Sequence, residues 1–317
     1  MPVQKINKLK KEKNAVILAH CYQNLEVDEV ADYVGDSLYL SRMAAETDAD
    51  IIVFAGVFFM AQTAKILSPN KKVLLPRLES GCLMADMVNP AQLREFKAKH
   101  PGLPVVCYVN STAGVKSECD ICCTSSNAVK IVKSLNAKEV LFLPDTYLGK
   151  YVESQLDGVN VITYPGFCPT HLRIRPEDVI SARKKHPGAL VLAHPECHKA
   201  VADLADYVGS TTGIMDFAAK SSAKTFIIAT EKGVADRLQR DFGSRHCEPA
   251  EVNPLAKQSS HSKEFILIKE DIVCPNMKWH TLDDIYNSLE FEQHEITVDE
   301  DIAAKALGSI ERMMEVS

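Results

Sequence analysis

The chain has 317 residues, of which 46% are hydrophobic and 25% are charged, a composition typical of a globular protein with a sizeable core. Its net charge of −6 gives no electrostatic attraction for nucleic acid or for an anionic membrane, and neither is expected as a partner. The apolar stretch 51–64 is too short to cross a bilayer, and the N-terminus lacks an apolar signal core, so we expect a cytoplasmic protein.

Helices and strands alternate in the first part of the chain. In chain order we expect an amphipathic basic helix over 3–13, a buried strand over 15–19, a helix over 27–34, a turn over 35–37, a helix over 38–45, a strand over 51–55, a helix over 58–67 and a strand over 72–75. Continuous apolar strands alternating with helices indicate a parallel sheet that is covered on both faces.

This pattern recurs twice farther along the chain. Leu18-Ala19-His20 returns as Leu192-Ala193-His194 at an offset of 174, and 31–35 returns as 205–209 at the same offset. Val106-Cys107-Tyr108 lies 88 residues after the first string and marks a middle copy. A shared internal period indicates a repeated structural unit. The sequence therefore predicts an α/β fold of three pseudo-symmetric repeated domains, each with a short parallel sheet.

The repeats set the expected domain boundaries: 1–87 together with 275–317, 88–171, and 172–274. Pro90 and Pro176 mark the opening helices of the second and third repeats, because proline is favoured in the first turn of a helix. The polar, aperiodic stretch 242–263 is interpreted as an insertion at the surface. Two helices expected over 282–289 and 299–314 should pack back on the first repeat.

Three cysteines, Cys82, Cys168 and Cys274, close the three repeats and are followed by similar residues. Cysteines in a reducing compartment favour metal or catalytic use over disulfides. Three equivalent points in three packed repeats can converge on one axis, where three thiolates would form a metal or cluster site with a vacant position. Structural zinc normally takes four ligands, and catalytic zinc more often uses histidine. An iron–sulfur cubane with three cysteine ligands leaves one iron open as a Lewis acid.

The other seven cysteines offer weaker signals. Cys119 and Cys122 have the C-x-x-C spacing of half a zinc site, but no second C-x-x-C completes it. Cys107 and Cys123 lie in apolar surroundings, where a cysteine behaves as a small hydrophobic residue. The remaining three have no assignment: Cys21, Cys197 and Cys247.

Polar side chains occur at the carboxyl ends of the predicted central strands, where parallel sheets bind ligands. The six positions, in matching register, are His20, Tyr22, Tyr108, Asn110, His194 and Glu196. A single histidine at a strand end is more often structural, but six polar positions in register favour a binding site. Ser37, Ser125 and Thr211 come just before predicted helices. They could simply be N-caps, but helix N-termini also bind phosphate and carboxylate groups, so we expect a small anionic substrate.

Several of these segments together resemble the quinolinate synthase family over nearly the whole chain. They are the segments 20–23, 31–37, 108–112, 123–125, 194–197 and 207–211. The resemblance implies a transferase of NAD biosynthesis with three pseudo-symmetric α/β domains around a 4Fe–4S cluster. The reaction it implies condenses iminoaspartate with dihydroxyacetone phosphate to quinolinate, releasing phosphate and two waters. An L-aspartate oxidase or an aspartate dehydrogenase would supply the iminoaspartate.

The resemblance also implies roles for individual residues. The cluster ligands would be Cys82, Cys168 and Cys274. The substrate contacts would be His20, Ser37, Tyr108, Asn110, Ser125, His194, Glu196 and Thr211. Glu196 would be the main acid–base group, assisted by Tyr22, with His20 and His194 donating hydrogen bonds to substrate oxygens.

Two positions depart from the family pattern. Many members carry two further cysteines before the last ligand, and the resemblance implies a redox-sensitive disulfide between them. Here those positions are Ile268 and Asp271, so no such switch is expected. Cys21 replaces an asparagine that family members often carry after the first histidine.

Three rival interpretations of the sequence stay open. They are an electron-carrying iron–sulfur protein, a zinc- or iron-dependent hydro-lyase or aldolase, and a non-catalytic repeat scaffold.

Overall fold

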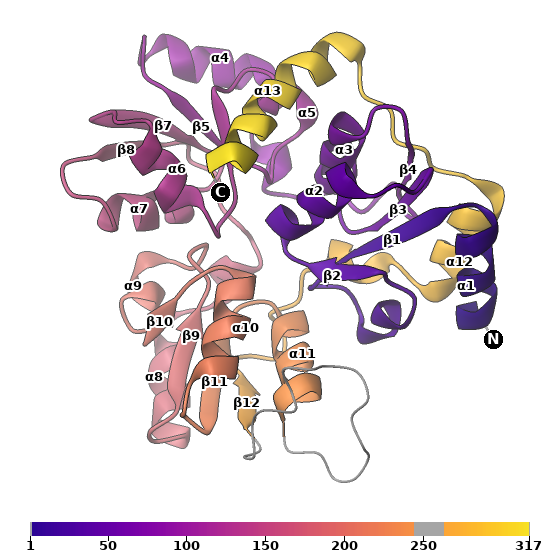
Figure 1. Cartoon of the computed structure of the whole chain (residues 1–317). Helices are drawn as coiled ribbons and strands as arrows, with labels where there is room; N and C mark the ends of the chain where they lie inside the picture. The colour runs from indigo at the N-terminus through magenta and orange to yellow at the C-terminus, as the bar shows by residue number, and fades with distance from the viewer. Residues whose placement is uncertain (1, 244–262, 317) are drawn as a thin grey trace. The chain divides into compact units, whose positions relative to one another are not determined.

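The computed structural model describes residues 2–243 and 263–316, which include three parallel four-stranded sheets (Figure 1). The first sheet has the order β2 (Tyr33–Gly35), β1 (Ala15–His20), β3 (Ile51–Ala55) and β4 (Lys72–Leu74). The second has the order β6 (Ile121–Cys123), β5 (Val105–Tyr108), β7 (Glu139–Leu143) and β8 (Asn160–Thr163). The third has the order β10 (Tyr207–Val208), β9 (Leu190–Ala193), β11 (Thr225–Ala229) and β12 (Glu264–Leu267).

The identical strand order in the three sheets confirms the predicted fold of three repeated α/β domains. The described chain divides into two compact units, Met1–Cys168 with Pro275–Ser317, and Pro169–Cys274. The first unit holds the first two sheets and the second unit holds the third. The exact boundaries of the three repeats stay a prediction, and most of the proposed insertion, 244–262, lies outside the described residues.

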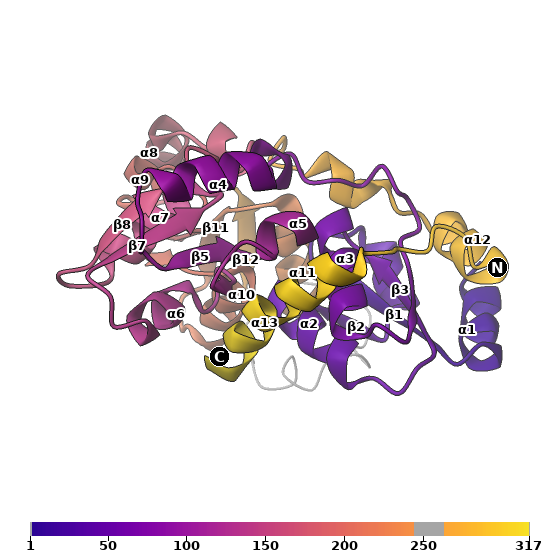
Figure 2. The same ribbon diagram turned by 90° about the horizontal axis from the view of Figure 1, so that it is seen from above.

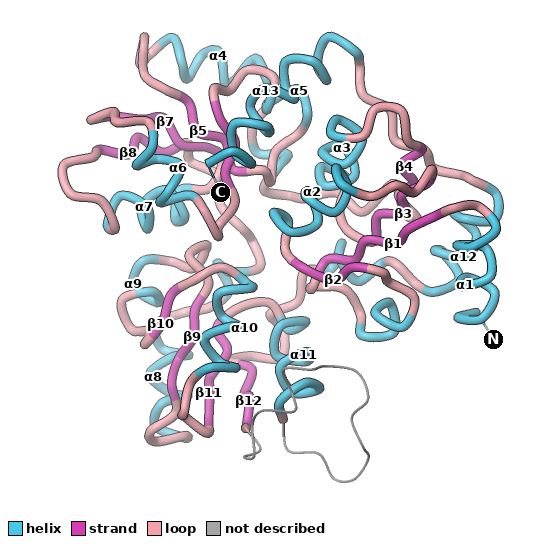
Figure 3. The backbone as a smooth tube through the Cα atoms, in the orientation of Figure 1, coloured by secondary structure: helices cyan, strands magenta, loops and turns pink. Residues whose placement is uncertain are grey.

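Helices follow the strands in each repeat (Figure 3). The first repeat contains α1 (Pro2–Glu12), α2 (Ser37–Glu46) and α3 (Phe58–Leu67). The second contains α4 (Pro90–Ala98), α5 (Ala113–Lys116), α6 (Ala128–Ser134) and α7 (Thr146–Ser154). The third contains α8 (Pro176–Lys185), α9 (Lys199–Ala202), α10 (Thr211–Lys220) and α11 (Lys232–Phe242). Pro90 and Pro176 begin α4 and α8, as predicted.

The helix predicted over 27–34 was wrong. The structure has a short 3₁₀ turn, Leu25–Glu29, followed by the edge strand β2. The Asp32 carboxylate accepts a hydrogen bond from the Ile17 N–H at 2.8 Å, and the Asp32 N–H donates to the Ile17 carbonyl at 2.9 Å. These two bonds hold the following residues beside β1, where an aromatic and a β-branched residue fit a strand better than a helix.

The same aspartate latch recurs in the other two repeats. The Asp120 carboxylate accepts from the Val105 N–H at 2.7 Å, and the Asp120 N–H donates to the Val105 carbonyl at 3.1 Å. Asp206 makes the same two bonds with Val191, at 2.7 and 2.8 Å. Each aspartate lies 15 residues after its partner. The repeat is therefore reproduced at the level of single hydrogen bonds.

The two C-terminal helices pack on different repeats of the first unit. Ile285 and Leu289 of α12 (Leu282–Phe291) share a buried core with Ile6 and Leu9 of α1, as predicted, and Figure 1 shows the two helices side by side. The helix α13 (Glu300–Val316) instead contacts β6 and α5 of the second repeat, and also α3 (Figure 2). The expectation that both helices cover the first repeat is therefore met by α12 and only in part by α13, which also packs on the second repeat. Among the described residues, no helix is long and apolar enough to span a bilayer.

Removing one latch should destabilise its sheet. In Asp120→Ala the Val105 N–H loses its acceptor, and the free energy of unfolding should fall by about 1–2 kcal/mol. Asp203→Ala, which removes an exposed ion pair with Lys199, should change it by less than about 0.5 kcal/mol. Urea unfolding followed by circular dichroism measures both changes. Equal effects of the two substitutions would contradict the structural role of the latch.

The junction between α12 and the first sheet should depend on pH. Hydrogen bonds from Lys13 and Lys72 lower the pKa of Glu292 from 4.5 to about 2. A depressed pKa adds stability above pH 4.5 that is lost as the pH falls toward 2. Glu292→Gln should thus be less stable than wild type near neutral pH, and the difference should shrink across this window in denaturant titrations. Because the carboxylate is partly exposed, 1 M salt should also reduce the difference. A difference independent of both pH and salt would contradict this assignment.

Candidate active site

The end of β1 presents a histidine with a defined tautomer. The Tyr22 N–H donates to Nδ1 of His20 at 3.1 Å, and the Tyr22 ring meets the imidazole edge to face at 4.6 Å. Because Nδ1 accepts this bond, the proton of the neutral ring lies on Nε2. His20, which is 6% exposed, therefore offers an N–H donor at the carboxyl end of its strand.

The third repeat contains the same arrangement. The Glu196 N–H donates to Nδ1 of His194 at 3.3 Å, so His194 also carries its proton on Nε2. His194 follows β9 directly, 174 residues after His20. The Glu196 carboxylate lies 3.8 Å from the same Nδ1. Since this nitrogen already accepts a backbone N–H, we interpret that approach as a contact and not as an ion pair.

The second repeat places Tyr108 and Asn110 at the corresponding positions. Tyr108 is buried at the end of β5. The Oδ1 atom of Asn110 is buried and accepts no hydrogen bond from any described residue. An unsatisfied buried oxygen costs about 1–3 kcal/mol. This atom therefore fits a contact with a donor group on a ligand.

The hydroxyl residues near the helix starts are not the N-caps themselves. Asp36 caps α2 through the Tyr39 N–H, so Ser37 is the first helical residue. Ser210 caps α10 through the Gly213 N–H, which leaves Thr211 as the first residue there. Both helices have ten residues, and their N-terminal N–H groups can receive an anion. The alternative interpretation of Ser37 and Thr211 as helix N-caps was thus wrong.

The segment before α6 is organised differently. Asn127 is the N-cap position, and its Oδ1 accepts from the Thr124 N–H at 2.7 Å. Ser125 lies in the turn between them. Ser126 donates to the Asp36 carboxylate at 2.9 Å and so joins this turn to the start of α2 in the first repeat. The turn is thus fixed by side-chain hydrogen bonds rather than by a long helix.

Two buried polar residues that the sequence did not predict, His171 and Thr230, lie next to Glu196 in a chain of polar contacts. Nδ1 of His171 lies 2.8 Å from the Glu196 carboxylate, and Nε2 of His171 lies 2.9 Å from the Thr230 hydroxyl. The His171 ring stacks on that of His194 at 4.7 Å. His171, Glu196 and Thr230 are 1%, 4% and 0% exposed. The sequence held one hint of a role for His171. It lies three residues after Cys168, whereas the corresponding positions after Cys82 and Cys274 are the apolar residues Ala85 and Met277.

The described cysteines fall into two classes. Cys82, Cys168 and Cys274 are partly exposed, whereas the other six described cysteines are buried. Burial raises the pKa of Cys107, Cys122 and Cys123, which disfavours the thiolate that metals require. The C-x-x-C pair is also engaged locally: the Cys119 thiol lies 3.1 Å from the Val115 carbonyl, and that of Cys122 lies 3.4 Å from the Ser309 hydroxyl.

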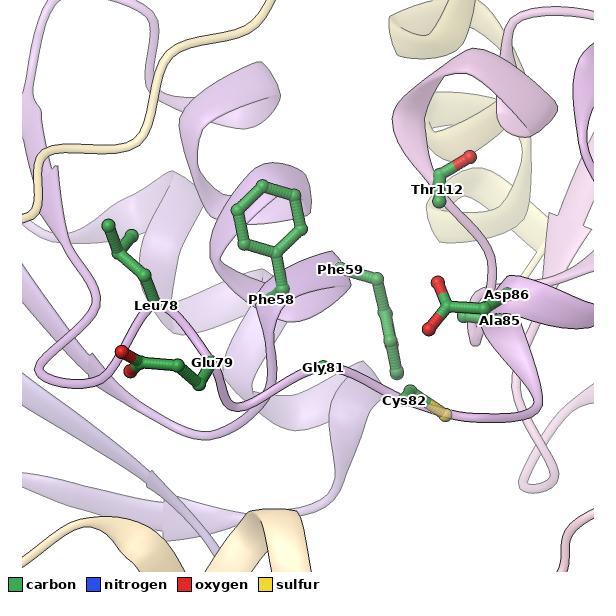
Figure 4. A pocket seen from close by; sticks show the side chains of 9 residues that line it. All are labelled: Phe58, Phe59, Leu78, Glu79, Gly81, Cys82, Ala85, Asp86 and Thr112. Carbon is green, nitrogen blue, oxygen red and sulfur yellow. The ribbon is translucent and has the colours of Figure 1, made fainter.

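Each partly exposed cysteine sits in a structured loop. Cys82 lines a pocket of about 280 Å³ together with the carboxylates of Glu79 and Asp86, and Figure 4 shows the Phe59 side chain extending toward it. The Cys274 N–H donates to the buried Glu231 carboxylate at 3.2 Å. Cys168 lies at the chain position where the two compact units divide.

Residues beside the predicted ligands are hydrogen-bonded to one another within the first unit. Asn276, two residues after Cys274, donates to the Gly81 carbonyl at 2.8 Å. The Phe167 N–H lies 3.4 Å from the sulfur of Met87. These bonds join the chain beside Cys82 to the segments beside the other two cysteines. That the three sulfurs share one site stays a prediction.

Comparison with known proteins identifies the family. The family model described as "Quinolinate synthetase A protein" matches residues 4–315. The chain belongs to this family. It is 50% identical over 314 residues to the quinolinate synthase of Alkaliphilus metalliredigens, covering 99% of this chain and 98% of that protein. The quinolinate synthases of Dehalococcoides mccartyi strain CBDB1 (50% over 312 residues; 98% and 97%) and Caldicellulosiruptor saccharolyticus (45% over 314 residues; 99% and 98%) are also similar.

The exposure classes predict chemical reactivity. In metal-free protein, iodoacetamide should label Cys82, Cys168 and Cys274 well before the six buried cysteines, because the reagent reaches the partly exposed class more easily. Burial also raises the pKa of Cys107, Cys122 and Cys123, which slows their labelling further. Peptide mass spectrometry over a time course measures the order. Cys247 lies outside the described residues, and the prediction does not include it. Early labelling of Cys107 or Cys122 would contradict the two classes.

Proposed function

We propose that the chain is a quinolinate synthase that condenses iminoaspartate with dihydroxyacetone phosphate. Quinolinate, phosphate and two waters would be the products, and the reaction balances without an external oxidant or reductant. The observation that carries the proposal is the family match over residues 4–315. The buried Glu196–His171 pair supports it, because dehydration and tautomerisation require a group that gives and takes protons.

The residues present fit a 4Fe–4S cluster. The donor set is three thiols, which suit iron–sulfur chemistry, and they are the three partly exposed cysteines of the described chain. We propose Cys82, Cys168 and Cys274 as the ligands. A cluster held by three cysteines would supply one open iron as a Lewis acid that polarises a substrate hydroxyl.

Substrate anions would be bound by the ends of helices and strands. The N–H groups at the starts of α2 and α10, near Ser37 and Thr211, suit carboxylate or phosphate. Ser125 would contribute its hydroxyl from the turn before α6. Nε2–H donors of His20 and His194 would bind substrate oxygens, and this role is supported by the backbone bonds to their Nδ1 atoms.

Two further substrate contacts come from the second repeat. Asn110 offers an oxygen that lacks a donor among the described residues, which suits an imine or hydroxyl group of the substrate. Tyr108 is placed beside it at the end of β5. Both residues are proposed here to orient the substrate and not to exchange protons with it.

Glu196 is proposed as the general acid–base group. Its Oε2 atom faces Nδ1 of His171, and the carboxylate held in this way would take a proton from the substrate and return it to a leaving hydroxyl. Tyr22, held against the His20 ring, would assist as a second hydroxyl near the reacting groups. Burial of Glu196 at 4% exposure would keep bulk water from competing for the proton.

The remaining assignments concern the cellular setting. We propose a cytoplasmic enzyme of NAD biosynthesis that receives iminoaspartate from an L-aspartate oxidase or an aspartate dehydrogenase. The net charge of −6 gives no reason to expect nucleic acid or an anionic membrane as a partner. Small anionic substrates would instead be bound locally, by the N–H groups at helix N-termini.

An anaerobic assay tests this function. Reconstituted protein should form quinolinate, with about four irons and four sulfides per chain for a cubane cluster. Glu196→Gln should lower kcat by about 10²- to 10⁴-fold because the proton-transfer group is lost, while iron and sulfide stay unchanged. Glu177→Gln, an exposed substitution in α8, is the matched control. Wild type that contains iron and sulfide but forms no quinolinate would refute the function, and a fully active Glu196→Gln would refute the acid–base role.

A further inference from the structure

A threonine hydroxyl lies behind the Glu196–His171 pair. Thr230 directly follows β11, and its Oγ1 lies 2.9 Å from Nε2 of His171. Register pairs Ala193 with Ala229, so the residues that follow them, His194 and Thr230, lie side by side at the strand ends. Thr230 is 0% exposed. Its hydroxyl is therefore part of the buried group around Glu196.

The donor and acceptor capacities of the three side chains indicate what this hydroxyl does. A general base starts its cycle as a carboxylate, which only accepts hydrogen bonds, so Nδ1 of His171 must carry a proton toward Glu196. In a neutral ring Nε2 then has a lone pair and needs a donor, which the Thr230 hydroxyl supplies. In a doubly protonated ring the hydroxyl accepts from Nε2–H instead. Both states keep Nδ1–H directed at Glu196.

The repeat pattern shows that this group departs from symmetry. Glu196 corresponds to Tyr22 and Asn110 in the other repeats, and Thr230 corresponds to Gly56 and Pro144, which have no side-chain hydroxyl. The third sheet alone thus combines a carboxylate at one strand end with a hydroxyl at the next. A purely architectural residue would have no reason to change in the same repeat as the carboxylate.

We propose that Thr230 is a positioning residue for the reaction. Its hydroxyl holds His171 with Nδ1–H toward Glu196, and this bond fixes the carboxylate orientation that proton transfer needs. Thr230 itself touches neither substrate nor cluster ligand in this role. The inference rests on the proposed function, since it concerns the residue that carries the proton there.

The test uses the anaerobically reconstituted enzyme, with rates expressed per bound cluster. Thr230→Val keeps the shape and removes the hydroxyl, so kcat should fall about tenfold to hundredfold while KM stays within about threefold. Thr230→Ser, which keeps the hydroxyl, should retain kcat within about threefold. Thr230→Ala removes the hydroxyl without branching and gives the same test if the valine variant does not fold. Ser288→Ala, the loss of a buried hydroxyl in α12, is the control and should keep kcat.

A double-mutant cycle separates positioning from a general loss of packing. If Thr230 acts through His171, then Thr230→Val should cause little further loss in a His171→Leu background. Additive losses, an unchanged kcat in Thr230→Val, or a loss that follows iron content alone would each overturn the proposal. Wild type without quinolinate formation would instead refute the proposed function, so the two failures are distinguishable.

Discussion

The aspartate latch is the interaction on which the architecture depends. In each repeat one aspartate side chain and its own N–H bind both backbone groups of a single residue in the central strand. The latch fixes the register between the central strand and its short edge strand. Parallel strands in register end at one edge of a sheet, and His20 and His194 emerge at equivalent positions of that edge in the two latched repeats.

The three repeats share one scaffold but differ in chemistry at their strand ends. The first and third repeats present imidazoles whose Nδ1 atoms are occupied by backbone N–H groups. Only in the third does a carboxylate follow two residues later, buried against His171. The common scaffold thus supplies equivalent positions at the strand ends, and a few differences in one copy place a buried carboxylate there. This arrangement agrees with the general separation of fold from function.

Burial divides the cysteines more clearly than their spacing does. Cys119 and Cys122 have a spacing that is typical of metal sites, yet both are buried, and the Cys122 thiol has a raised pKa. The three widely separated cysteines, which share no short motif spacing, are the partly exposed ones. A metal centre requires thiolates and access, so exposure, unlike spacing, favours the three cysteines proposed as ligands.

The sequence alone determined the number of repeats, their α/β class and the polar strand ends, because a repeated hydrophobic period and shared offsets are local signals. It did not reveal β2, which depends on a hydrogen bond between Asp32 and Ile17 across 15 residues. The packing of α13 on β6 likewise depends on contacts between distant segments. His171 and Thr230 join Glu196 only through the fold, since 59 residues separate the first two. Local patterns thus specify elements and candidate residues, whereas tertiary structure decides which of them meet.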